Sequence, residues 1–270
     1  MPAFPILTYH SQIFHANSYS GNDHLALARD LELVHETGRR IEPLARLVGW
    51  LDGSVAGADL EGAVFLTFDD GSRLDAEDVE HPEFGLQRGF RGILRDFSAR
   101  HGTPGGGALH ATSFVIASEE ARQKMDARSL YGKNWMGDDW WRRVDREGLI
   151  AIENHSWDHN HPDLGGSGRG DFHGIASHDQ CMEQVVRSAE AIGRITGRRP
   201  EFFAYPFGQS SAFMRESFFP DNRERHGCTA AFGTDPAPVT RGSDRWNLPR
   251  YVCGRDWNSP DGLQRILEAG

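Results

Sequence analysis

Short apolar segments alternate with longer segments of helical periodicity along nearly the whole chain, and this alternation constrains the fold more than any other feature. Residues 63–68 are the clearest apolar segment, and their continuous apolarity is typical of a strand buried on both faces. Strands are predicted for residues 4–10, 63–68, 109–116, 149–153, 202–205 and 229–232, with a further segment at 247–252. Repeated strand–helix alternation favours a parallel sheet or an α/β barrel with right-handed crossovers.

Helices are expected between these strands. The first begins at Asn22 or Asp23 and ends at Gly38, and the second starts at Pro43. The others are predicted near residues 86–101, 119–127, 138–147, 177–195, 213–225 and 260–268. Residues 75–89 and 102–107 predict loops, and the glycine-rich stretch 165–174 predicts a flexible loop beside the active site rather than a domain boundary. Residues 1–270 are therefore predicted to form one domain.

The charge balance restricts the class of partner. Against 29 Lys and Arg stand 39 Asp and Glu, so the net charge of −10 argues against nucleic-acid binding. No apolar run approaches the roughly 18 residues of a membrane span. The first residues lack the basic and apolar regions of a secretory signal, which predicts a cytoplasmic protein, with a secreted form trimmed of its signal as the alternative. Cys181, Cys228 and Cys253 are too few and too widely spaced for a disulfide framework or a cysteine zinc site.

Polar clusters follow four of the predicted strands at the point where each strand ends. They are Tyr9-His10, residues 69–71 (DDG), residues 154–159 (NHSWDH) and residues 205–208 (YPFG). In α/β barrels the carboxyl ends of the strands build the active site. Four clusters at equivalent ends therefore predict one shared pocket.

Two of these clusters contain the residue types of a metal site. Asp69 and Asp70 point in different directions from a strand end, so one can bind a metal while the other acts as a base, although an Asp-Asp-Gly turn is an equal alternative. The spacing of His155 and His159 lets both imidazoles reach one zinc ion from a single helical turn. Ordinary surface or core histidines are the alternative, and His161 is a competing ligand. One Asp and two His leave a position for water, as in catalytic zinc sites.

The same residues resemble the motifs of a known family. Residues 67–71 (TFDDG), 155–159 (HSWDH) and 203–208 (FAYPFG), in this order, are similar to the first three motifs of the polysaccharide deacetylase family, which is also called the NodB homology domain or carbohydrate esterase family 4. Residues 7–10 (LTYH) resemble the start of many members. The resemblance spans roughly residues 4–255 and implies a distorted (β/α) barrel that hydrolyses amides with the help of a metal.

The resemblance also implies a role for each matched residue. Asp69 would be the general base, and Asp70, His155 and His159 would hold the metal. The backbone N–H of Phe207 would help to stabilise the oxyanion. Zinc is the expected ion, and such ligands also accept cobalt, nickel, manganese or iron.

Two departures from the family pattern concern the partners of the base. The arginine of the third motif is replaced by Ala204, and Arg250 is predicted to supply that charge from another strand end, with a surface ion pair as the alternative. The family's Leu-x-His motif, which carries the general acid, is absent after residue 208. His10 is the first candidate for this acid, with packing as its alternative, and the weaker candidates are His161, His173 and His178.

The predicted function is N-deacetylation of an N-acetylated sugar or polysaccharide. Hydrolysis of a small linear or cyclic amide on the same fold is the alternative within the enzymes, and a non-catalytic metal- or carbohydrate-binding relative is the alternative outside them. Trp135, Trp140 and Trp141 could stack on a sugar ring, but core packing is the preferred interpretation.

Overall fold

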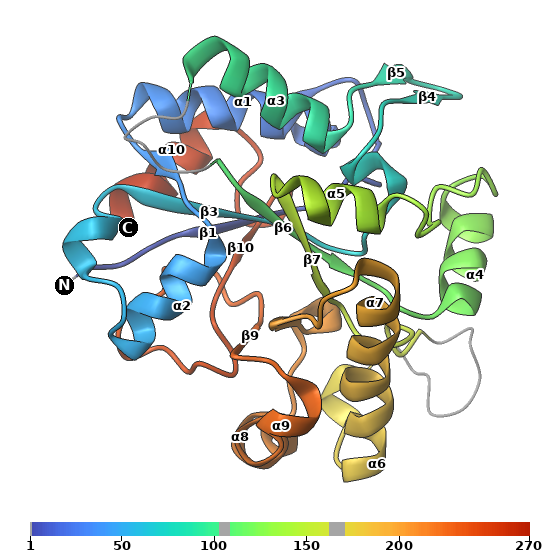
Figure 1. Cartoon of the computed structure of the whole chain (residues 1–270). Helices are drawn as coiled ribbons and strands as arrows, with labels where there is room; N and C mark the ends of the chain where they lie inside the picture. The colour runs from blue at the N-terminus through green and yellow to red at the C-terminus, as the bar shows by residue number, and fades with distance from the viewer. Residues whose placement is uncertain (1, 103–108, 162–170) are drawn as a thin grey trace.

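The fold was analysed in a computed structural model that describes residues 2–102, 109–161 and 171–270. Within them, parallel strands form an eight-stranded sheet in the order β10-β1-β3-β6-β7-β8-β9, with β2 beside β3 (Figure 1). The strands are β1 (Ile6–Tyr9), β2 (Arg40–Ile41), β3 (Ala63–Phe68), β6 (Ala111–Val115), β7 (Ile150–Asn154), β8 (Phe202–Ala204), β9 (Ala230–Phe232) and β10 (Tyr251–Val252). The predicted α/β class with parallel strands is confirmed, although the sequence analysis missed the short strand β2.

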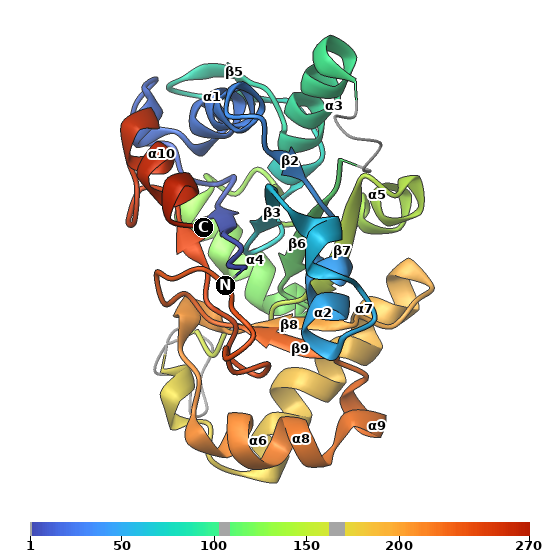
Figure 2. The same ribbon diagram turned by 90° about the vertical axis from the view of Figure 1, so that its left-hand side faces the viewer.

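Helices surround this curled sheet (Figures 1 and 2). One group consists of α1 (Asp23–Glu36), α3 (Phe90–His101) and α10 (Pro260–Ala269), and a second of α5 (Trp141–Glu147) and α7 (Ser188–Thr196), which pack beside β7. The others are α2 (Leu44–Asp52), α4 (Glu119–Ser129), α6 (His178–Cys181), α8 (Phe219–Asp221) and α9 (Arg223–His226). In the described residues, no helix has the length and apolarity needed to cross a membrane.

The two edges of the sheet are brought together by residues 245–252. Leu248 N donates to Ala231 O and Gly233 N donates to Leu248 O, both at 2.9 Å, which ties this segment to β9. A few residues later, Tyr251 and Val252 of β10 pair with Leu7 and Thr8 of β1. The segment therefore bridges the first and last strands of a distorted barrel, and Arg250 lies in the middle of this bridge.

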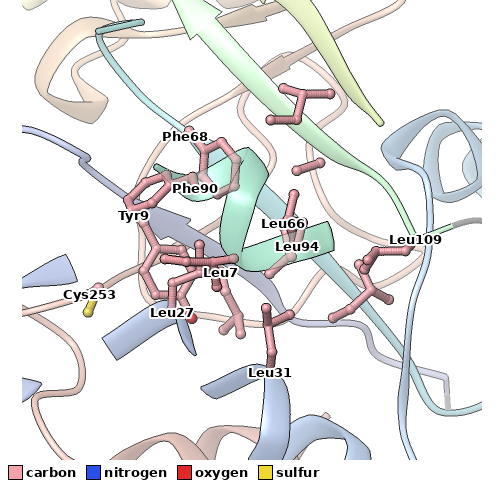
Figure 3. Packing of buried hydrophobic residues seen from close by; sticks show 14 of the residues in the cluster. Leu7, Tyr9, Leu27, Leu31, Leu66, Phe68, Phe90, Leu94, Leu109 and Cys253 are labelled. Atoms are coloured by element: carbon pink, nitrogen blue, oxygen red, sulfur yellow. The ribbon is translucent and has the colours of Figure 1, made fainter. Parts of the chain in front are cut away.

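The largest part of the core lies between the sheet and the helices α1 and α3. Leu7 and Leu66 from the strands pack with Leu31 from α1 and Leu94 from α3 in one buried cluster (Figure 3). Trp135, Trp140 and Trp141 are also buried, which confirms the core interpretation of these tryptophans. The three cysteines are buried and unpaired, as expected.

The boundaries of several predicted helices were wrong. The helix expected from residue 86 begins at Phe90, because β4 (Val79–His81) and β5 (Gly85–Gln87) form an antiparallel hairpin inside the region predicted as a loop. The helix expected from residue 138 begins at Trp141. The helix predicted for residues 213–225 is divided into the π-helical turn Met214–Phe218, α8 and α9, because Pro220 has no N–H for a regular helical ladder.

The helix predicted for residues 177–195 is observed as α6, the π-helical segment Met182–Arg187 and α7. The loop expected at residues 102–107 falls mainly on residues 103–108, which lie outside the described residues. Most of the predicted active-site loop at 165–174 also lies outside them, and its last residues, Phe172–Gly174, form a short 3₁₀ turn.

Candidate active site

The end of β3 presents two aspartates in different directions. Asp69 continues the sheet, since its N–H donates to Tyr9 O at 3.1 Å. Asp70 and Gly71 then adopt positive φ angles of 75° and 69°, which turns the Asp70 side chain away from that of Asp69. A Cβ atom on Gly71 would lie 2.5 Å from Val115 Cγ1, so the tight approach of this turn to β6 requires glycine.

The segment after β7 carries the two histidines in an irregular loop. The prediction that His155 and His159 share a helical turn was wrong, because Ser156 and His159 have positive φ angles of 75° and 61°. Side chains determine the local path instead. Asn154 Oδ1 accepts from Ser156 N at 2.9 Å, and Ser156 Oγ accepts from His159 N at 3.0 Å. The loop nevertheless brings both imidazoles to the same place.

Asp70, His155 and His159 form a candidate metal site. Asp70 Oδ1 lies 3.4 Å from His155 Nε2 and 3.3 Å from His159 Nε2. One potential ligand atom from each of the three residues lies within 4.8 Å of the others. His155 Nδ1 is paired with Ala204 O at 2.9 Å, which turns its Nε2 toward Asp70. Within the described residues this cluster contains His159 and not the competing ligand His161.

The donor atoms in this cluster suit a divalent cation. Asp70 Oδ1 is buried and makes no hydrogen bond within the described part of the chain. A buried carboxylate oxygen without a donor is costly unless a cation or a solvent molecule satisfies it. One carboxylate and two imidazoles are ligands that zinc and related ions accept, and three protein ligands leave a position open.

The electrostatics of the cluster favour positive charge. Burial by itself would raise the pKa of Asp70, but the imidazoles of His155 and His159 outweigh it and hold this pKa well below its usual range. Burial lowers the pKa of His155, but the charges of Asp69 and Asp70 reverse this effect and raise the pKa above its usual value. For His159, burial prevails and the pKa is lowered. The two carboxylates thus create a site that attracts a proton or a metal ion.

Asp69 is held by Arg250, as the sequence predicted. The guanidinium donates from Nη1 to Asp69 Oδ1 at 2.7 Å and from Nη2 to Oδ2 at 2.9 Å, and Arg250 is 0% exposed. Burial would raise the pKa of Asp69. The charge of Arg250, followed by those of His155 and His10, outweighs burial and lowers this pKa below its usual value. Asp69 is therefore ionised at neutral pH and can accept a proton.

Phe207 and His10 border this cluster. Phe207 has a left-handed backbone (φ 57°), packs its ring edge-on against His159 with centroids 4.4 Å apart, and is 51% exposed. His10 follows β1, is partly buried, and its backbone N–H donates to Asp23 Oδ2 at 2.7 Å. Because its charge acts on the pKa of Asp69, His10 lies close enough to remain the first candidate for the acid.

The other histidines considered as acids have partners elsewhere. His173 pairs with Ser210 O at 3.0 Å, and His178 approaches Asn222 Oδ1 at 3.4 Å on the surface. His161 lies in the loop that follows His159, and burial lowers its pKa. These contacts leave His10 as the strongest of the candidates.

Sequence analysis missed two polar residues of the site. Gln12 donates from its side-chain amide to Asp70 Oδ2. Asp75 lies fully buried in the region predicted as a loop and accepts hydrogen bonds from Ser11 Oγ and Ser113 Oγ. The signal for Gln12 was its position directly after the strand-end residues Tyr9-His10. Asp75 gave no comparable signal, since an acidic residue in a charged, glycine-containing stretch is usually exposed.

Comparisons with known proteins give an independent assignment. Residues 107–218 match the family model described as polysaccharide deacetylase, and this range includes His155, His159 and Phe207. No curated protein matches the chain.

Solved structures are similar over nearly the whole chain. A deacetylase from Streptococcus pyogenes, PplD in complex with acetate, is 16% identical with a TM-score of 0.65 and covers 99% of each chain. IcaB from Ammonifex degensii is 18% identical with a TM-score of 0.67 and covers 99% of this chain and 97% of its own. A de-N-acetylase from Aggregatibacter actinomycetemcomitans is 14% identical with a TM-score of 0.65 and covers 97% of this chain and 99% of its own. At these identities the matches establish the fold.

The sequence match and the shared fold agree with the resemblance predicted from the motifs. The family model accounts for the second and third motifs, and the solved structures account for the curled parallel sheet with its outer helices. The chain is therefore an amidohydrolase of the polysaccharide deacetylase type.

Proposed function

We propose that the protein is a metal-dependent N-deacetylase of an N-acetylated carbohydrate, with zinc as the expected ion. The observation that carries the proposal is the convergence of Asp70 Oδ1, His155 Nε2 and His159 Nε2 next to Asp69, whose carboxylate is held by Arg250. Hydrolysis of a C–N bond needs a Lewis acid and a base side by side. Two adjacent aspartates in different surroundings supply sites for both.

Asp70, His155 and His159 would hold the ion. When bound, a divalent ion activates water and polarises the acetyl carbonyl. Asp69 accepts a proton from the water as its oxygen bonds to the carbonyl carbon. The backbone N–H of Phe207 donates to the oxygen on which negative charge develops.

The second half of the reaction needs a proton on the leaving nitrogen. We assign this transfer to His10, because its side chain lies near Asp69 and the other candidates make contacts elsewhere. The C–N bond breaks as the nitrogen takes up the proton. The products are acetate and a sugar with a free amine, and no further reactant is needed.

The proposal is tested by measuring acetate release from N-acetylglucosamine oligomers together with the zinc content of each variant. In Asp69→Asn, the rate is expected to fall about 10²–10⁴-fold because the base is lost, while about one zinc per chain stays bound. In His155→Ala, both zinc and activity are expected to be lost. His178→Ala is the matched control, since this exposed histidine lies at a surface contact with Asn222 and should change neither.

Two results would contradict the proposal. One is a wild-type protein that binds no zinc or related ion after reconstitution. The other is an Asp69→Asn variant that releases acetate at the wild-type rate, which would remove Asp69 from the reaction.

A further inference from the structure

The turn formed by residues 10–13 places a glutamine directly against the candidate metal site. Ile13 N donates to His10 O at 3.0 Å and closes this turn. Gln12 lies on it and donates from Nε2 to Asp70 Oδ2. The reverse orientation of the amide would place the carbonyl oxygen Oε1 against a carboxylate oxygen, so the donor must face Asp70.

A buried anchor determines where this turn lies. Ser11 is fully buried, and its Oγ contacts Ser72 Oγ at 2.7 Å and donates to Asp75 Oδ1. The backbone oxygen of Ser11 is paired with His24 Nε2 at 2.7 Å. Because Ser11 is pinned from both its side chain and its backbone, the neighbouring Gln12 has little freedom to move away from Asp70.

Gln12 also divides the two oxygens of the Asp70 carboxylate. Oδ2 accepts from Gln12, whereas Oδ1 faces the two imidazoles without any hydrogen bond among the described residues. Asp69 differs, because Arg250 donates to both of its oxygens. A guanidinium compensates the charge of a carboxylate, but a neutral amide fixes its orientation and leaves its charge for a cation.

We propose that Gln12 is a positioning residue, which holds Asp70 so that Oδ1 is presented to the metal ion. This inference rests on the proposed function, since it assigns a role within the same metal site. Partners that orient metal ligands typically change metal affinity about 10–100-fold when they are removed. Gln12 acts through Asp70 and has no assigned contact with the reacting atoms.

The test is a zinc titration of the purified full-length chain after removal of metal. Gln12→Met keeps the size of the side chain but removes the donor, so the zinc dissociation constant is expected to rise about 10–100-fold. The visible spectrum of the cobalt-loaded protein, which reports the ligand geometry, is expected to change as well. Gln123→Met is the matched control, because Gln123 donates to the carboxylate of Glu119 at 2.9 Å on the surface of α4.

Two further measurements separate this inference from the proposed function. The thermal midpoint of the metal-free Gln12→Met variant should stay near that of the metal-free wild type, which excludes general unfolding as the cause. The His155→Ala variant marks complete loss of the site. A wild-type dissociation constant and cobalt spectrum in Gln12→Met, with zinc lost in His155→Ala, would overturn the role of Gln12 and leave the proposed function intact. A wild type as poor in zinc as His155→Ala would overturn both.

Discussion

Asp69 and Asp70 are neighbours in the sequence, but their carboxylates have different partners. Arg250 satisfies both oxygens of Asp69, and the structure leaves one oxygen of Asp70 directed at two histidines. Burial would raise both pKa values, and in both cases nearby positive or hydrogen-bonding groups lower them instead. Environment rather than residue type therefore makes one aspartate available as a base and the other as a ligand.

The pair of Asp69 and Arg250 leads to a prediction about pH. The lowered pKa of Asp69 means that the contribution of the ionised pair is present above the ordinary carboxyl pKa and is lost as the pH falls through the lowered value. In Arg250→Met, burial prevails and the pKa of Asp69 rises. The acidic limb of the kcat/KM profile is expected to move up by about 1–3 pH units. An unmoved limb in an active variant would contradict this prediction.

The same variant should lose stability. Removing one partner of a buried ion pair costs about 3–5 kcal/mol, because a buried charge is left without compensation. The control is Arg29→Met, which breaks the exposed pair with Glu36 and should cost less than about 1 kcal/mol. Urea unfolding of the three proteins at pH 7 provides the comparison.

At the scale of elements, loops at the ends of parallel strands place the site residues. Asp69 and Asp70 follow β3, the two histidines follow β7, and Phe207 follows β8. Adjacent strands of a parallel sheet end at one edge, so the sequence pattern was enough to predict that these residues meet. The path of the histidine loop was not predictable in the same way, because it depends on hydrogen bonds from Asn154 and Ser156.

Gly71 provides a prediction about the turn after β3. Gly71→Ala should destabilise the protein and weaken zinc binding, because its Cβ would lie 2.8 Å from the Cα atom of Val115 as well as close to its side chain. Gly148→Ala is the matched control, since Gly148 also has a positive φ angle, 79°, but an added Cβ meets nothing within 4 Å. The control should lose only about 1–2 kcal/mol for its backbone conformation. Equal losses of stability and zinc affinity in the two variants would show that the contact with Val115 is unimportant.

At the scale of the whole molecule, the segment of residues 245–252 joins the edges of the sheet and completes the site. It carries Arg250 to Asp69, from which it is separated by 181 residues along the chain. The fully buried Asp75 lies at a similar junction, because Ser11 after β1 and Ser113 in β6 both donate to it. Burial raises the pKa of Asp75 to about 7, with further increases from the charges of Asp70 and Asp69.

The raised pKa of Asp75 couples global stability to pH. Between about pH 4 and pH 7 the folded state binds a proton that the unfolded state has released, so stability falls as the pH rises through this window. In Asp75→Asn this contribution disappears. The advantage of the variant in unfolding free energy should therefore grow from pH 4 to pH 8 by up to about 4 kcal/mol, at about 1.4 kcal/mol per pKa unit. Denaturant unfolding at both pH values checks this, and a constant difference between the proteins would contradict it.

The sequence by itself determined the parallel α/β fold, the amidohydrolase family and the residues from which the metal site is assembled. Apolar runs and the polar residues that end them are local features, so they can be read along the chain. Only the tertiary structure decided that Arg250 meets Asp69 and that Gln12 holds Asp70. These contacts depend on how residues 245–252 close the sheet and on how Ser11 is anchored, and such relations between distant segments leave no periodic pattern in the sequence.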